Sequence, residues 1–431
     1  MPRLPPETID LILNFISWDD EVSAAATLHR CALAGRDLLS LAQDHLYRSI
    51  HLTKSYSSSV LLSRTLHANF ELAQVIKVLS VNVNLIFTRS LATASRGAFD
   101  DSATDSGMDV STPTVLPFHL MTKLHTLKLL GEASTDELDE DEFIWHIISR
   151  LPRLEHLECK SIMFTYWYQL TSLPFISSSP DAFPVTDEGL PRLKTLKFEE
   201  CRFPSHLFQE ALIRWLRPSM EVLQNLQTPS PDTCDWWTFI SSASTHLRSL
   251  TIPVRDRWPN RMNLHPNSEL RSQFPNYHAY VANIVAQCSY LRALHIKHEH
   301  SVWDVRVSSP ALLEALCSVL ARDPAPFPTL ADFTLTIPID VWDGEYARMM
   351  PFAPDLRARF IDSFLDRNRF PHFCRVTFYL WAERWNGKVW TSEMDWEECH
   401  SDLVVKTWRT AFAAFESPGV TLDVSVHLEP V

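Results

Sequence analysis

The sequence predicts an α/β fold in which short parallel strands alternate with helices along a solenoid. Residues 193–203 carry apolar side chains at positions 1, 4, 6 and 11 of the segment and a cysteine at position 9. Because side chains alternate between the two faces of a strand, Leu196 and Phe198 are expected to point inward and Lys197 outward. The same spacing recurs along the chain, and helical patterns lie between the copies.

The spacing of residues 193–203 recurs in four further segments, in two weaker ones and in one fainter unit. The four begin at Leu124, Leu154, Leu247 and Leu291, the weaker ones at Ile76 and Leu330, and the fainter unit at Met220. This pattern resembles that of leucine-rich repeats. The better copies are roughly 30 to 55 residues apart, against the usual ~20 to 29, so the resemblance implies an irregular solenoid with the shape of a horseshoe.

Apolar stripes typical of helices separate the strand segments. In residues 205–216 the apolar side chains fall at i, i+1, i+4, i+5, i+8 and i+9, and Pro218 ends the pattern. Similar stripes lie at 143–148, 277–285, 312–320 and 360–364. An ordinary mixed α/β enzyme domain is the alternative interpretation. Such a domain would normally carry a glycine-rich phosphate loop, and this sequence, with 8 glycines, has none.

Composition narrows the classes of partner. The net charge of -13 argues against a general nucleic-acid-binding protein, because phosphate contacts need clustered lysine and arginine. The 8 cysteines form no CxxC pair and the N-terminus has no secretory pattern, so we expect reduced thiols in the cytoplasm, the nucleus or both. No apolar run approaches the ~20 residues of a membrane span. We expect neither nucleic acid nor membrane as a partner.

Residues 1–52 predict three short helices that form a separate module. The first opens at Pro5-Pro6-Glu7; its apolar face is expected to hold Ile9, Ile12, Leu13 and Ile16, with Asp10 and Asn14 on the other side. The second runs from about Asp19 toward His29. The third follows Gly35 and buries Leu38, Leu41, Ala42 and Leu46. Because so small a core is marginal on its own, the module is expected to dock on another surface.

Three segments of this module resemble the F-box of substrate receptors in Skp-cullin-F-box ubiquitin ligases. They are Leu-Pro-Pro-Glu from residue 4, Cys-Ala-Leu-Ala-Gly-Arg from residue 31, and Leu-Tyr-Arg-Ser-Ile from residue 46, and together they cover about one-eighth of the chain. The resemblance implies that the module binds a Skp-type adaptor and, through it, a cullin scaffold. The residues that would form or support the adaptor surface are Leu4, Pro5, Ile9, Leu13, Ile16, Leu28, Cys31 and Leu33. The alternative is a helical subdomain that caps the open end of the solenoid.

Residues 53–431 are expected to form the solenoid itself. A stretch rich in Ser, Thr, Asp and Gly predicts a flexible loop near 97–114, and residues 165–192 are expected to be an insertion between repeats. The acidic run at 132–142 suits a solvated helix start or, alternatively, a contact with a basic partner. From about 338 the spacing weakens, and strand and helix patterns continue as a C-terminal cap. Five tryptophans there either pack in the cap or form a recognition pocket: Trp381, Trp385, Trp390, Trp396 and Trp408.

The outward positions of successive parallel strands would line one face of the solenoid. Their mixed charge suits a protein or peptide ligand. The residues expected to bind a protein substrate on this concave face are Lys128, Glu158, Lys160, Lys197, Glu199, Thr251, His295, Lys297 and Thr334. The prediction depends on register, because a slip of one residue would send every one of these side chains into the core.

No arrangement of residues in the sequence predicts catalysis. His295, His298 and His300 are candidate zinc ligands, but side chains along a strand diverge, so an exposed polar strand edge explains them better. Cys159 and Cys201 fall where small buried side chains fit a bend. HExxH and G-x-S-x-G patterns are lacking. We therefore expect a substrate receptor without catalytic activity or cofactor. The alternatives are a repeat scaffold with no ubiquitin role and, with less support, a hydrolase or metal enzyme.

Overall fold

The computed structural model describes residues 5–16, 21–34, 36–52, 56–83, 116–131, 148, 151–162, 192–201, 212–213, 216–229, 234–255, 277–299, 313–322, 327–339, 352–382, 401–416 and 419–428. The chain divides into two compact units, Met1–Phe208 and Gln209–Val431. The loop predicted near 97–114, the acidic run at 132–142 and nearly all of the insertion at 165–192 lie outside the described residues.

Three helices form a small module at the start of the first unit, as predicted. They are α1 (Pro6–Ile16), α2 (Glu21–Ala34) and α3 (Arg36–Arg48). One buried residue from each helix makes the centre of the module: Leu13, Leu28 and Ala42 are between 0% and 3% exposed. Ile9 and Cys31 pack against this centre and remain partly exposed. The module thus holds itself together with few side chains, as expected for a core of this size.

Helix α1 turns Ile9 and Leu13 of the predicted face inward, but not Ile12. Ile12 is 46% exposed, although it was placed on the buried face. Asp10, placed on the opposite side, accepts a hydrogen bond over 2.8 Å from Nε2 of His45, which is buried on α3. Asp10 makes this contact because a buried imidazole needs a polar partner. The helix is apolar on several sides, so its own periodicity could not decide which side the module would cover.

The first unit continues as a ladder of parallel strands. The elements are β1 (Ser49–Leu52), α4 (Tyr56–Ala68), α5 (Phe70–Val75), β2 (Val78–Asn82), η2 (Phe118–Leu120), β3 (Thr126–Leu130), β4 (His156–Lys160) and β5 (Thr195–Glu199). Each of these strands pairs in parallel with the next one in sequence. Leu127, Leu157 and Leu196 are register partners and all are buried. The inward positions predicted from the repeat spacing are therefore confirmed for these strands.

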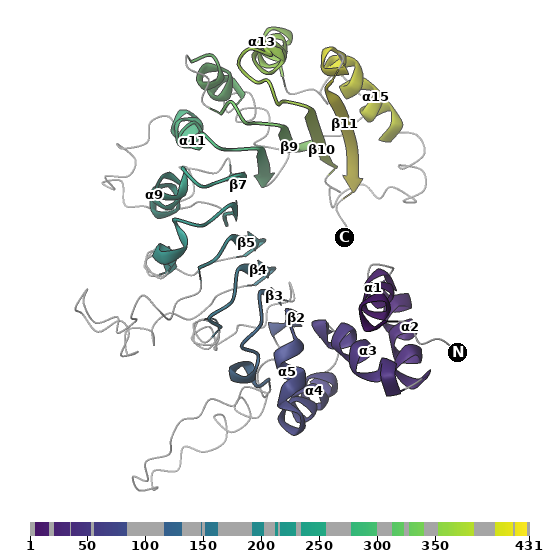
Figure 1. Cartoon of the computed structure of the whole chain (residues 1–431). Coiled ribbons are helices and arrows are strands. Elements are labelled where there is room, and N and C mark those ends of the chain that lie inside the picture. Colours follow the sequence, from purple (N-terminus) through teal and green to yellow (C-terminus); the bar gives the residue numbers. More distant parts are fainter. Residues whose placement is uncertain are drawn as a thin grey trace, which may run out of the picture. The chain divides into compact units, whose positions relative to one another are not determined.

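The second unit repeats the plan, and all of its strands but the first are longer. Its elements are η4 (Arg217–Ser219), β6 (Asn225–Gln227), α9 (Cys234–Ala243), β7 (Ser249–Arg255), α11 (Tyr277–Val285), β8 (Ala293–Glu299), β9 (Asp332–Ile339), α13 (Pro354–Leu365), β10 (Arg375–Ala382), α15 (Ser401–Ala411), η6 (Ala413–Glu416) and β11 (Thr421–Leu428). Strands β6 to β11 are parallel and follow the order of the sequence. Figure 1 shows α9, α11, α13 and α15 along one face of these strands.

The helices cover the inward face of the strands through an aromatic core in the second unit. Phe333 of β9 packs on Phe360 of α13, with ring centroids 5.4 Å apart. Phe378 of β10 packs on Phe412 at 4.5 Å and on Trp408 of α15 at 5.2 Å. All five of these side chains are 0% exposed. Trp408 therefore belongs to the core, whereas Trp385, Trp390 and Trp396 lie outside the described residues.

Tight turns end the strands of the first unit on one side. Ser161 follows β4 and Glu200 follows β5, and both have left-handed backbones, with φ of 53° and 55°. Gly131 follows β3, and its N–H donates to the carbonyl of Lys160 over 2.7 Å. A Cβ on Gly131 would lie 2.1 Å from the carbonyl oxygen of Ser161, so this close approach requires glycine. The successive strand ends are thereby stacked directly on one another.

The predicted fold class is confirmed at the level of an α/β protein with parallel strands in sequence order. The helices expected at 277–285 and 360–364 are present as α11 and part of α13, and residues 313–320 are helical as well. The helix predicted at 205–216 falls mostly outside the part of the chain that the structure describes. None of the described helices is long and apolar enough to cross a lipid bilayer.

Replacing a ring of the aromatic core tests the packing of the second unit. We expect Phe360→Ala to lower the free energy of unfolding by about 3–5 kcal/mol, because the lost burial and the remaining cavity both destabilise the unit. Tyr290→Ala is the matched control, since Tyr290 is 60% exposed, and it should change stability by less than about 0.5 kcal/mol. Urea unfolding followed by tryptophan fluorescence measures both. Equal stability of the two variants would contradict the described core.

Candidate protein-binding surfaces

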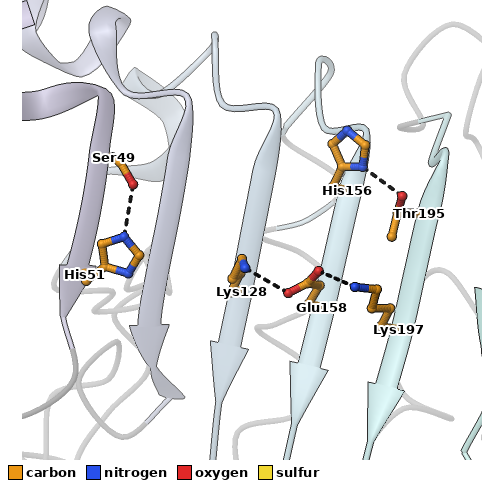
Figure 2. Close-up of polar contacts among 7 residues, drawn as sticks. All are labelled: Ser49, His51, Lys128, His156, Glu158, Thr195 and Lys197. Carbon is orange, nitrogen blue, oxygen red and sulfur yellow. Dashed lines mark hydrogen bonds and ion pairs between the residues drawn. The ribbon is translucent and has the colours of Figure 1, made fainter. Parts of the chain in front are cut away.

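The outward face of β3, β4 and β5 carries a row of alternating charges. Lys128, Glu158 and Lys197 are register partners on these three strands, and we call them the charged ladder. Figure 2 shows both lysines reaching Glu158 from the strands on either side. The Nζ of Lys128 lies 3.1 Å from Oε2 of Glu158, and the Nζ of Lys197 lies 3.0 Å from Oε1. One carboxylate thus binds two ammonium groups across three strands.

The environment of Glu158 favours its ionised form. Partial burial on its own would raise the pKa of this carboxyl group, but the hydrogen bonds and charges of Lys197 and Lys128 outweigh burial and hold the pKa below its ordinary value. Because each lysine shares a single carboxylate, both ammonium groups keep hydrogen-bonding capacity for another acceptor. The charged ladder is therefore a fixed set of charges on the strands with room for further polar contacts.

Further polar pairs extend this face along the strands. Lys160 of β4 contacts Glu199 of β5 at 3.2 Å, and His156 shares a hydrogen bond of 2.9 Å with Thr195. Lys194 Nζ lies 2.8 Å from a carboxylate oxygen of Glu155, just before the strands begin, and lowers the pKa of that group. On β1, Ser49 and His51 are joined by a 3.0 Å hydrogen bond, also drawn in Figure 2. Acidic and basic side chains are mixed here, which suits a protein surface better than a polyanion.

The outward face of the second unit is rich in hydroxyl groups. Register aligns Thr251, His295, Thr334, Thr377 and Asp423 on β7 to β11. The next row holds Lys297, Thr336, Tyr379 and Ser425 on β8 to β11. His295 Nε2 and Thr336 Oγ1 share a hydrogen bond of 2.7 Å. Burial, assisted by the charge of Lys297, lowers the pKa of His295 to about 4, so this imidazole is neutral at physiological pH.

Cys159 and Cys201 are buried, and the described histidines belong to no metal-binding group. No group of three His, Cys, Asp or Glu side chains there is placed to hold a metal ion. The side chains of His298 and His300 lie outside the described residues, so the metal arrangement considered above is not testable in full. Burial raises the pKa of Cys201 to about 12 and that of Cys159 well above its ordinary range. The Cys201 thiol donates to the carbonyl of Cys159 over 3.3 Å.

The residues predicted to bind a substrate lie on the outward strand faces of the two units. The first unit holds Lys128, Glu158, Lys160, Lys197 and Glu199, and the second holds Thr251, His295, Lys297 and Thr334. Sequence reasoning missed Thr195 and His156 beside the first set and Tyr379 and Asp423 beside the second. Extending the strand register to β10 and β11 would have identified the last two, because they occupy the same outward rows.

Some of the residues predicted to bind an adaptor are buried and others are exposed. Leu13 and Leu28 lie in the core of the helical module, so they would support such a surface from beneath. Leu33 is 75% exposed, and Pro5 is exposed as well. Leu4 and the side chain of Ile16 lie outside the described residues. Three exposed apolar residues of the module were not among those predicted to contact an adaptor: Leu11 at 57%, Ile12 at 46% and Leu39 at 40%.

Removing the central carboxylate tests the charged ladder. We expect Glu158→Gln to lower the free energy of unfolding at neutral pH by about 1 kcal/mol or less, since the groups are partly exposed. Because the pKa of Glu158 is lowered by folding, its stabilisation is present above its ordinary value of 4.5 and is lost as the pH falls through the lower folded value. The gap between wild type and variant should therefore close in acid. Glu199→Gln, which removes a carboxylate paired with Lys160, should have a smaller effect; equal effects would contradict the two-lysine geometry.

The partly buried imidazole of His295 predicts an acid sensitivity of the second unit. Folding lowers the pKa of His295 from 6.5 to about 4, so the unfolded chain binds one more proton in this window and stability falls as the pH drops from 6.5 toward 4. We expect His295→Gln to flatten that part of the stability profile, measured by urea unfolding across the window. The control His372→Gln changes an exposed histidine before β10 and should leave the slope as in the wild type. An unchanged slope in His295→Gln would contradict burial of the neutral form.

Comparison with known proteins adds no family to this geometry. No family model matches the chain, and no curated protein matches it. The case for a function therefore comes from the helical module, the exposed apolar side chains on it and the polar strand faces.

Proposed function

We propose that this chain is the substrate-binding subunit of a Skp-cullin-F-box ubiquitin ligase. In this proposal the helical module α1 to α3 binds a Skp-type adaptor, which links the chain to a cullin scaffold. The strand repeats, which we propose are leucine-rich repeats, bind a protein substrate on their outward faces. Other subunits carry the conjugating enzyme and ubiquitin, so no side chain of this protein takes part in the transfer.

The observation that carries the proposal is the set of exposed apolar side chains on the helical module. Leu11 and Ile12 on α1 are 57% and 46% exposed, and Leu33 near the end of α2 is 75% exposed. Apolar side chains that gather in solvent on one module mark a candidate contact site for a partner protein. Each would gain ~1.5–3 kcal/mol on full burial, before the costs of association are subtracted. An apolar adaptor surface would supply that burial.

The strand faces support the second half of the proposal. Parallel strands in fixed register place polar side chains of successive repeats in rows, as in the charged ladder of Lys128, Glu158 and Lys197. Rigid rows of this kind suit recognition of a folded or extended protein segment. Holding substrate and conjugating enzyme on one scaffold raises the effective concentration of substrate lysines near the enzyme. The proposed mechanism is therefore one of positioning.

Binding of a purified Skp-type adaptor tests the proposal. We expect the triple variant Leu11→Asp, Ile12→Asp, Leu33→Asp to bind the adaptor at least about 100-fold more weakly than the wild type, because three apolar anchors are lost. These side chains are exposed, so the variant should keep its fold, whereas an aspartate at the buried Leu13 would unfold the module. Isothermal titration calorimetry measures the affinity for the adaptor, and circular dichroism checks that each variant is folded.

A matched control lies on the next helix along the chain. Leu61 on α4 is 60% exposed and belongs to none of the three module helices, so Leu61→Asp should bind the adaptor like the wild type. Equal weakening by Leu61→Asp would show that the effect is not specific to the module. If the folded wild type fails to bind at all, the ligase role is wrong, and a repeat scaffold with no ubiquitin role becomes the better interpretation.

A further inference from the structure

A tyrosine stands on the outward face of the second unit between two side chains with hydroxyl groups. Tyr379 of β10 is 38% exposed, and its register partners are Thr336 on β9 and Ser425 on β11. Its ring centroid lies 6.4 Å from that of His295 and 5.8 Å from that of His427. The Oγ of Ser425 has no hydrogen-bond partner within the described part of the chain. We call Tyr379, Thr336, Thr377, Asp423 and Ser425 the tyrosine patch.

One carboxylate borders the tyrosine. Asp423 is the register partner of Thr377, which places it two positions before Ser425 on β11, diagonally next to Tyr379 on the same face. Asp423 is exposed and makes no ion pair among the described residues. The arginine of β10 lies at the start of its strand, where Arg375 Nε is 3.6 Å from an oxygen of Asp332. The tyrosine patch therefore combines an aromatic ring with a carboxylate that makes no ion pair among the described residues.

Arg375 stands on the same face of β10, two positions before Thr377, but its Nε lies 3.6 Å from Asp332 on β9. Lys297 shares a row with Tyr379, but it stands on β8, two strands away. His295 approaches the ring more closely, and its imidazole is neutral at physiological pH because burial lowers its pKa to about 4. The whole chain carries a net charge of -13, which steers basic molecules toward it. An incoming cation would thus meet the ring of Tyr379 and the carboxylate of Asp423, with Arg375 held at Asp332 and Lys297 two strands away.

We propose that the tyrosine patch binds an arginine or lysine side chain in an extended segment of a partner protein. The cation would lie against the ring of Tyr379, where the negative face of the aromatic system attracts it, and its N–H groups would donate to the exposed carboxylate of Asp423. The charged ladder of the first unit offers no such carboxylate, because Glu158 is already bound by two lysines. The inference rests on the proposed function in that it gives the chemistry of the substrate segment.

Selection from random peptides tests the inference on the full chain. A library of short random peptides displayed on phage is panned on immobilised wild-type protein without any adaptor, so the outcome does not depend on adaptor binding. We expect recovered peptides to be enriched in arginine or lysine, and a synthetic copy of a recovered peptide to bind about tenfold more weakly when that residue becomes glutamine. Tyr379→Leu and Asp423→Asn should each weaken binding of the same peptide to a similar extent.

Two control variants separate the patch from general attraction to an acidic protein. Tyr290→Leu removes a 60% exposed tyrosine outside the strands, and Asp402→Asn removes an exposed carboxylate in the first turn of α15. Both should bind the selected peptide like the wild type. Absence of basic enrichment would overturn the proposal, as would basic peptides that bind Tyr379→Leu and Asp423→Asn undiminished. Adaptor binding measured on the same preparations shows independently whether the proposed ligase role holds.

Discussion

The register of the parallel strands is the constraint on which the rest of this structure depends. Side chains along each strand are buried alternately. On β4, Leu157 and Cys159 are buried, and Glu158 between them points outward to two lysines on the neighbouring strands. In the second unit the same alternation buries Phe378 against Trp408 and exposes Tyr379. A shift of one residue would exchange these faces, so core packing and surface chemistry are fixed together.

The strands could be predicted from the sequence because the spacing of apolar residues within each repeat identifies the side chains that point inward. Leu127 and Leu129 are buried, Lys128 is not, and the same spacing marks the other repeats. The C-terminal copies match the repeat spacing less well, because Phe378 takes a leucine position on β10 and packs on Trp408 of α15, so the outward register was not extended to β10 and β11. Tyr379 and Asp423 were missed for that reason. Their place on the surface follows only when the paired strands give them a common row.

The orientation of the first helix shows a limit of reasoning from periodicity. With Ile9, Leu11, Ile12 and Leu13 close together, α1 has more apolar side chains than its two neighbours can cover. Ile9 and Leu13 pack into the module, Asp10 reaches the buried His45 on α3, and Ile12 is left in solvent. This arrangement leaves exposed the apolar side chains on which the proposed adaptor contact depends.

Hydrogen–deuterium exchange of the full chain, alone and with a purified Skp-type adaptor, tests the central claim most directly. The account predicts slower exchange in α1 and α2, whose exposed side chains Leu11, Ile12 and Leu33 would become buried, with no change in β3 to β5 far along the chain in the first unit. Unchanged exchange across residues 6–34 at saturating adaptor would contradict the account. Protection confined to the strands would contradict it equally, since the adaptor would then occupy the face proposed for the substrate.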